Sequence, residues 1–287
     1  MNTIVATFQE TQELAKKVAR SLKAKHSEII TKQFPDGESY IKLQVNPKNK
    51  TVIFIVSFAH EPNKKIIEAI LAAQTARDYK AKRIILVATY LPYMRQDKRF
   101  NDYESLSAQT IIPLLAGYFD EIFAIDPHLH RIKSLKQLVP NIQVITTNKL
   151  LADYVEKHFP DYKIVGPDEE SRQWDVSIAK ALKREATILK KQRLSSYKVR
   201  ISSKKLGEKV LIIDDIISTG KTILETIKIA KKHGAKKLAV IGIHGIFANN
   251  CDKQIAKHAA LITTNTIQNK YAKIDVSSMI VETLEKL

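Results

Sequence analysis

Cysteine and long apolar runs are scarce in this 287-residue chain, and each shortage excludes a class of protein. The one cysteine, Cys251, cannot form an intramolecular disulfide, so a reducing cytoplasm is the expected compartment. No apolar run approaches the roughly 20 residues of a membrane-spanning helix. Residues 1–11 also lack the basic start and apolar core of a signal peptide. We therefore expect a cytoplasmic protein without a membrane partner.

Acidic residues are also in short supply. The chain carries 47 Lys and Arg against 30 Asp and Glu, which gives a formal net charge of +17. The basic excess is spread over both halves, whereas a nucleic-acid-binding surface gathers basic residues on one face and interleaves aromatic ones. We therefore expect no nucleic-acid partner and infer that the positive field attracts small anionic substrates.

Short apolar segments alternate with longer helical patterns along the chain. Buried strands are predicted at residues 51–58, 83–90, 121–125, 162–165, 210–213 and 238–243, with helices between them. Strands that alternate with helices form mainly parallel sheets flanked by helices. We therefore predict an α/β protein of two similarly built domains, residues 1–145 and residues 146–287, with the final helix packing back on the N-terminal domain.

The segment from residue 209 to residue 233 carries the clearest chemical pattern. Its apolar strand runs into two acids, Asp214 and Asp215, and then into a small-residue turn that opens a helix. The turn consists of Ser218, Thr219, Gly220, Lys221 and Thr222. Backbone N–H groups at a helix start bind anions, and hydroxyl groups add further donors. The segment therefore predicts a phosphate site beside carboxylates that hold sugar hydroxyls or a metal ion.

This turn has two other interpretations. Residues 219–222 match the end of a nucleoside-triphosphate P-loop, but that motif needs a glycine where this chain has Asp215. The P-loop interpretation therefore fails. The second is a strand, turn and helix without a ligand, which leaves two adjacent carboxylates at the end of a buried strand without a use for them.

Two further strand ends carry groups that suit a divalent cation. Asp126 and His128 follow one predicted strand, and Asp168 follows another. Carboxylates without a thiolate favour Mg²⁺, and Mn²⁺ fits the same donors. The alternatives are a capped loop with a solvated histidine, or His130 as the ligand in place of His128.

Three more segments have both a functional and an ordinary interpretation. Arg95, Gln96 and Asp97 combine a planar cation, an amide and a carboxylate, which suits polyphosphate oxygens or a local surface pair. Lys191 and Arg193 place two cations on a loop that either closes over a phosphoryl group or is simply solvated. Residues 34–38, with the sequence Phe-Pro-Asp-Gly-Glu, contain ordinary turn chemistry.

The order of these motifs along the chain resembles that of the ribose-phosphate pyrophosphokinase family, also called phosphoribosyl-diphosphate synthetases. The resemblance extends from about residue 3 to the C-terminal helix and is strongest to the shorter, archaeal-like forms. It implies two domains of phosphoribosyltransferase-like fold. It also implies a cytoplasmic enzyme of nucleotide biosynthesis, a ribose-phosphate diphosphokinase that transfers the diphosphoryl group of Mg-ATP to the 1-hydroxyl of ribose 5-phosphate.

The resemblance further implies roles for individual residues. The ATP-binding residues would be Phe34, Asp36, Gly37 and Glu38, reaching in from a neighbouring subunit of a homo-oligomer, together with Arg95, Gln96 and Asp97. The residues for ribose 5-phosphate would be Arg193, Asp214, Asp215, Ser218, Thr219, Gly220, Lys221 and Thr222. The metal residues would be Asp126, His128 and Asp168, and the catalytic cations would be Lys191 and Arg193.

The chain departs from the family pattern at two places. Lys221 stands where the family usually has a second glycine, and residues 169–172 replace a glycine-containing turn. These departures leave a catalytically silent regulatory homologue as an alternative function. A second alternative is a salvage phosphoribosyltransferase, which would consume the diphosphate product.

Overall fold

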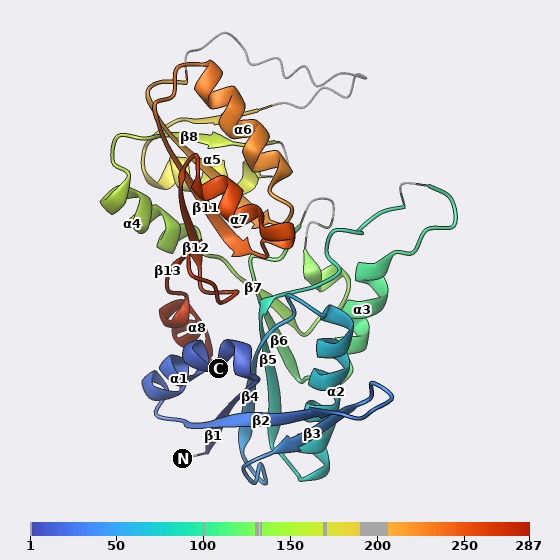
Figure 1. Ribbon diagram of the computed structural model, residues 1–287. Coiled ribbons are helices and arrows are strands. Elements are labelled where there is room, and N and C mark those ends of the chain that lie inside the picture. Colours follow the sequence, from blue (N-terminus) through green and yellow to red (C-terminus); the bar gives the residue numbers. More distant parts are fainter. Residues whose placement is uncertain (1, 100, 130–131, 133, 169–170, 190–205) are drawn as a thin grey trace. The chain divides into compact units, whose positions relative to one another are not determined.

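The computed structural model describes residues 2–99, 101–129, 132, 134–168, 171–189 and 206–287 (Figure 1). The chain divides into two compact units. The first contains Met1–Thr146, Thr266–Gln268 and Val276–Leu287, and the second contains Thr147–Asn265 and Asn269–Asp275. None of the described helices is both long and apolar enough to cross a membrane.

The first unit is built on a seven-stranded sheet with the order β3-β2-β1-β4-β5-β6-β7. Its strands are β1 (Thr3–Thr7), β2 (Lys25–Gln33), β3 (Ser39–Leu43), β4 (Thr51–Ser57), β5 (Arg83–Tyr90), β6 (Glu121–Ile125) and β7 (Ile142–Ile145). The helices are α1 (Gln12–Ser21), α2 (Pro62–Asp78), α3 (Ser107–Ala116) and α8 (Ser277–Leu284), with short 3₁₀ turns η1 (Gln9–Thr11) and η2 (Leu135–Gln137). All strand pairs are parallel except β2 with β3, which form an antiparallel edge.

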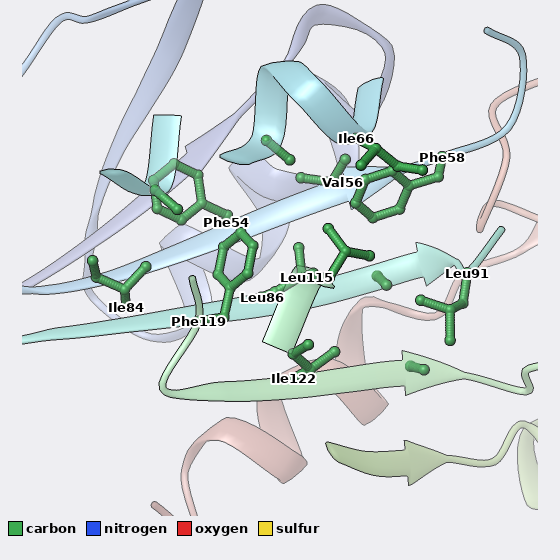
Figure 2. Close-up of a cluster of buried hydrophobic side chains, with 14 of the residues drawn as sticks. Phe54, Val56, Phe58, Ile66, Ile84, Leu86, Leu91, Leu115, Phe119 and Ile122 are labelled. Atoms are coloured by element: carbon green, nitrogen blue, oxygen red, sulfur yellow. The ribbon is translucent and has the colours of Figure 1, made fainter. Parts of the chain in front are cut away.

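Strand β4 is apolar along its length because both of its faces are covered. Phe54 and Val56 lie on the face that packs against α2 and α3, in the cluster drawn in Figure 2. Ile53 and Ile55 alternate with them and are also buried. The rings of Phe54 and Phe119 meet edge to face, with centroids 5.9 Å apart. Packing of this kind fixes β4 and β5 rigidly, so the loops that follow them start from defined positions.

The final helix of the chain, α8, belongs to the first unit and contacts α1. The short return segment Thr266–Gln268 belongs to this unit as well. There the buried hydroxyl of Thr89, on β5, donates a hydrogen bond of 2.7 Å to the main-chain oxygen of Thr266. This hydrogen bond ties the return segment to the central sheet of the first unit.

The second unit has a six-stranded, fully parallel sheet with the order β13-β12-β11-β10-β8-β9. Its strands are β8 (Lys163–Gly166), β9 (Ala186–Ile188), β10 (Lys209–Ile217), β11 (Lys237–Gly245), β12 (Ala260–Thr264) and β13 (Ala272–Ile274). The helices are α4 (Asn148–His158), α5 (Arg172–Ala181), α6 (Lys221–Lys232) and α7 (Cys251–Ala256), with the 3₁₀ turn η3 (Ala248–Asn250).

Alternation along β10 divides the core of the second unit in two. Val210 and Ile212 pack with α6 and α7, whereas Leu211 and Ile213 pack with α4 and α5. Strands covered on both faces read as continuous apolar runs, as this one does. The predicted α/β class, with mainly parallel sheets flanked by helices, is confirmed.

Candidate active site

The paired acids Asp214 and Asp215 lie inside β10, not after it. The sequence predicted that this strand ends at residue 213, and that boundary is wrong because β11 continues to pair with it as far as Ile217. On the other side, β8 pairs only with Val210–Ile212. The acids therefore extend beyond the end of β8, at the carboxyl edge of the sheet, which is the edge where open α/β sheets bind ligands.

Asp168 follows β8 and approaches the same carboxyl groups. The pKa of Asp214 is raised well above its ordinary value, first by burial and then by Asp215, Asp168 and Asp175. Closely spaced carboxylates create a region of negative potential when they are ionised. A cation or a set of hydroxyl donors would relieve this repulsion.

Asp175 was not predicted as a site residue. It lies in the first turn of α5, has no solvent exposure, and is hydrogen-bonded to the Ser171 hydroxyl, 2.7 Å from its Oδ2 atom. The sequence contains only a weak indication of a role for Asp175. The residue occupies the apolar face of α5 together with Ile178 and Ala179, where a carboxyl group is unusual.

The turn between β10 and α6 has the geometry of an anion site. Gly220 caps α6 with φ of +71°, a left-handed conformation that glycine adopts readily. A side chain there would meet the Cβ atom of Cys251 at 2.8 Å. Thr219 and Lys221 are exposed on either side of it, so the N-terminus of α6 is open to a ligand.

In the first unit, two predicted segments follow neighbouring strands. Residues 95–97 come after β5, and Asp126 and His128 come after β6, its parallel neighbour. The carboxyl ends of both strands lie at the same edge of the sheet. Asp126 and Asp97 are buried, whereas Arg95 is exposed.

Gln96 has a defined partner within the first unit. Its side-chain oxygen accepts a hydrogen bond of 2.7 Å from Ser107, at the start of α3. This contact orients the segment between β5 and α3. Arg95 is exposed, so its guanidinium group can bind an anion from solution.

Residues 34–38 form the turn of the β2–β3 hairpin. The turn is closed by a hydrogen bond of 2.8 Å from the Phe34 amide to the Glu38 oxygen, and Asp36 accepts from the Glu38 amide at 3.1 Å. Gly37 has φ of +99°. The Phe34 ring is half exposed and lies edge to face with Tyr40. The turn is ordered by its own bonds, and its side chains are displayed to solvent.

The predicted metal residues are divided between the two units. Asp126 and His128 belong to the first unit and Asp168 to the second. Within the described ranges, no three or more His, Cys, Asp or Glu side chains form a group that could hold a metal ion. Lys191 and Arg193 lie outside the described residues.

Comparisons with known proteins cover both units. The family model described as the N-terminal domain of ribose phosphate pyrophosphokinase matches residues 3–118, and a phosphoribosyl transferase domain matches residues 142–278. Two relatives named ribose-phosphate pyrophosphokinase are each 32% identical to this chain. The one from Thermoplasma acidophilum aligns over 95% of both chains, and the one from Pyrococcus abyssi over 92% of this chain and 93% of its own.

A solved structure matches the fold along the whole chain. It is the phosphoribosylpyrophosphate synthetase of Mycobacterium smegmatis, which is 22% identical, with a TM-score of 0.88 over 99% of this chain and 98% of that one. Both units therefore have the phosphoribosyltransferase-like fold that the resemblance implied. With full-length relatives at this identity, the chain belongs to the ribose-phosphate pyrophosphokinase family.

Proposed function

We propose that this protein transfers the diphosphoryl group of Mg-ATP to the 1-hydroxyl of ribose 5-phosphate. The products are 5-phosphoribosyl 1-diphosphate and AMP. The observation that carries the proposal is the alignment of more than 90% of the chain with relatives named ribose-phosphate pyrophosphokinase, together with the match of residues 3–118 to the N-terminal domain of that family. A salvage phosphoribosyltransferase does not need the N-terminal domain matched at residues 3–118.

Ribose 5-phosphate would bind to the second unit. Its phosphate would accept hydrogen bonds from the N-terminus of α6 and the turn formed by Ser218, Thr219, Gly220, Lys221 and Thr222. The ribose hydroxyls would donate to Asp214 and Asp215. Because both carboxyl groups are buried, little water competes for them, and each hydrogen bond from a ribose hydroxyl is stronger than it would be at the surface.

Mg²⁺ fits the donor chemistry of the site, and Mn²⁺ would be accepted by the same oxygens. The repulsion that its acidic neighbours exert on the Asp214 carboxylate favours a divalent cation nearby. We assign Asp126, His128 and Asp168 as the metal-binding residues. Substrate phosphate and hydroxyl oxygens would complete the coordination, as is usual for Mg²⁺. When bound, the ion neutralises phosphate charge.

ATP would be held by two groups of residues. Arg95, Gln96 and Asp97 follow β5, where the guanidinium group suits phosphate oxygens. The exposed hairpin residues Phe34, Asp36, Gly37 and Glu38 would reach the ATP site of a neighbouring subunit, which requires a homo-oligomer. We place the enzyme in the cytoplasm.

The chemical step is an in-line displacement at phosphorus. The ribose O1 atom forms a bond to the β-phosphorus, the bond from that phosphorus to the oxygen bridging to the α-phosphorus breaks, and the hydroxyl proton is released. Lys191 and Arg193 would neutralise the charge that develops on the transferring group. Arg193 would also contact ribose 5-phosphate. Positioning and electrostatics account for catalysis of this type.

A direct assay tests the proposal. Purified protein is incubated with Mg-ATP and ribose 5-phosphate, and AMP and 5-phosphoribosyl 1-diphosphate are measured. Equal amounts of both products are expected, and none without ribose 5-phosphate. Failure to form AMP at every phosphate and metal concentration tried would instead support a catalytically silent homologue.

A further inference from the structure

Asp175 is fully buried and only half satisfied. Its Oδ2 atom lies 2.7 Å from the hydroxyl oxygen of Ser171, whereas its Oδ1 atom has no hydrogen-bond partner in the part of the chain that the structure describes. Placing a carboxyl group in such surroundings is costly unless the fold gains something from it. We therefore expect Asp175 to have a role in addition to packing.

Space for this carboxyl group is created by Gly166, the last residue of β8. A Cβ atom built on Gly166 would lie 2.1 Å from Oδ2 of Asp175 and 2.8 Å from the Ser171 hydroxyl. The carboxyl group therefore packs directly against the main chain at the end of β8. Asp168, the assigned metal-binding residue, follows two positions later.

Ser171 links Asp175 to the main chain of Asp168. The Ser171 hydroxyl lies 3.0 Å from the main-chain oxygen of Asp168, and the Ser171 amide donates to the Asp168 carboxylate at 3.3 Å. Both ends of Asp168, its carbonyl and its side chain, are thus bonded to Ser171. The segment that carries the assigned metal-binding carboxylate depends on where Ser171 is held.

The number of available protons determines which group donates in the two hydrogen bonds of the Ser171 hydroxyl. The Ser171 hydroxyl has one proton but faces two oxygens, those of Asp168 and Asp175. Both contacts are satisfied only if Asp175 carries a proton and donates it to Ser171, which then donates to the Asp168 carbonyl. An ionised Asp175 would instead compete with that carbonyl for the single hydroxyl proton.

The surroundings of Asp175 favour this protonated form. Burial raises its pKa well above the ordinary value, and Asp168 and Asp215 raise it further, although the Ser171 hydroxyl lowers it. The N-terminus of α5 favours an anion at this position. Burial outweighs that effect because the carboxyl group has no solvent exposure.

We infer that Asp175 is a positioning residue that acts as a neutral donor. Through Ser171 it fixes the main chain of Asp168, and so places the Asp168 carboxylate for the metal-bound substrate. This inference rests on the proposed function, because it takes Asp168 as a metal-binding residue. Asp175 itself contacts neither substrate nor metal.

Three variants test the inference. Asp175→Asn keeps a neutral donor of the same shape, Asp175→Ala removes it, and Ser171→Ala removes the link. Mn²⁺ binding in the presence of ribose 5-phosphate is followed by the fluorescence of Trp174, the only tryptophan of the chain. We expect Asp175→Asn to stay within about twofold of the unaltered protein. The two alanine variants should each lose about 10-fold in Mn²⁺ affinity, within the usual range for residues that orient a metal ligand.

Steady-state kinetics give the second measurement. Both alanine variants should raise the KM for ribose 5-phosphate and the Mg²⁺ concentration needed for half-maximal rate, and Asp175→Asn should restore both. If Asp175→Asn is as impaired as Asp175→Ala, Asp175 acts as an ionised acceptor or ligand and the inference is overturned. It is equally overturned if Asp175→Ala and Ser171→Ala bind Mn²⁺ as tightly as the unaltered protein.

Two controls keep the results interpretable. Thermal unfolding establishes that each variant is folded, and if Asp175→Ala is not, Ser171→Ala carries the comparison with Asp175→Asn. Absence of AMP formation by the unaltered protein would overturn the proposed function. The Mn²⁺ titrations would still decide the role of Asp175, so the two failures are distinguishable.

Discussion

The thiol of Cys251 donates a hydrogen bond of 3.1 Å to the main-chain oxygen of Ser218, in the turn that precedes α6. The same side chain fills the space that a Cβ atom on Gly220 would need. Burial, followed by the nearby Asp252, raises the pKa of the thiol, so it keeps the proton that it donates. Cys251, the first residue of α7, thus packs against the assigned phosphate turn and stabilises it.

Cys251→Ala should loosen this turn. The lost hydrogen bond and the small cavity would cost about 1 kcal/mol, which corresponds to a severalfold rise in the KM for ribose 5-phosphate with little change in kcat. Cys251→Ser is the matched control because it keeps a donor, and we expect a smaller effect. The idea fails if the alanine variant leaves the KM for ribose 5-phosphate unchanged.

Asp214→Asn should raise the stability of the protein while it weakens the binding of ribose 5-phosphate. In the folded chain the pKa of Asp214 is raised, first by burial and then by its acidic neighbours, so its ionisation opposes folding as pH rises above about 4. The variant removes that penalty and should raise the free energy of unfolding at pH 7 by roughly 1–3 kcal/mol.

The same change should weaken ribose 5-phosphate binding strongly, because an amide is a poorer acceptor for two sugar hydroxyls. ATP binding should be retained. Thermal unfolding between pH 5 and pH 8 and calorimetric titration with each substrate give the measurements. Equal loss of both substrates would count against separate binding subsites, and a destabilised variant would contradict the electrostatic argument.

Lys65, on α2, should make stability depend on pH in a different range. Its side chain is only 12% exposed and pairs with Glu10. Burial lowers the pKa of Lys65 to about 8, although Glu68 raises it in part. In the unfolded chain a lysine has a pKa of about 10.4. Between these values the unfolded chain binds one more proton than the folded chain, so stability increases as pH rises.

Lys65→Met removes this contribution. The free energy of unfolding of the unaltered protein, measured relative to the variant, should rise by about 1–3 kcal/mol between pH 8 and pH 10.5. Urea unfolding at several pH values measures the difference. Lys64→Met, the neighbouring change on the same helix, is the control. A difference that does not vary with pH would show that the ion pair with Glu10 keeps Lys65 charged throughout.

The sequence was sufficient to predict the class of fold and the edge of each sheet where the chemical groups gather. Continuous apolar runs such as β4 and β5 identify buried parallel strands, and the residues that follow them must lie at one edge. Asp126 follows β6 and Asp168 follows β8 in this way, and their metal-binding role stays a prediction. Apolar runs are a local feature of the sequence, which is why the strands themselves could be predicted.

Features that depend on packing between distant segments could not be predicted. Strand β10 continues through Asp214 and Asp215 because β11 pairs with it as far as Gly245, opposite Ile217. Local polarity had suggested that the strand stops before the acids. The surroundings of Asp175 cannot be predicted from local sequence for a similar reason, since they are formed in part by Gly166 on a different element. Only the folded chain brings such residues together.

Lys191→Ala tests the assigned catalytic cation, which the family resemblance implies and which lies outside the described residues. If the ammonium group neutralises charge that develops only in the transition state, kcat should fall by about 100-fold or more while the KM values change little. Lys190→Ala removes the same charge one residue earlier and should leave kcat nearly unchanged. Steady-state kinetics with Mg-ATP and ribose 5-phosphate provide the comparison. A large rise in KM with an unchanged kcat would mean that Lys191 binds the substrate in its ground state. A similar loss of kcat in both variants would indicate that only the overall charge of this segment matters.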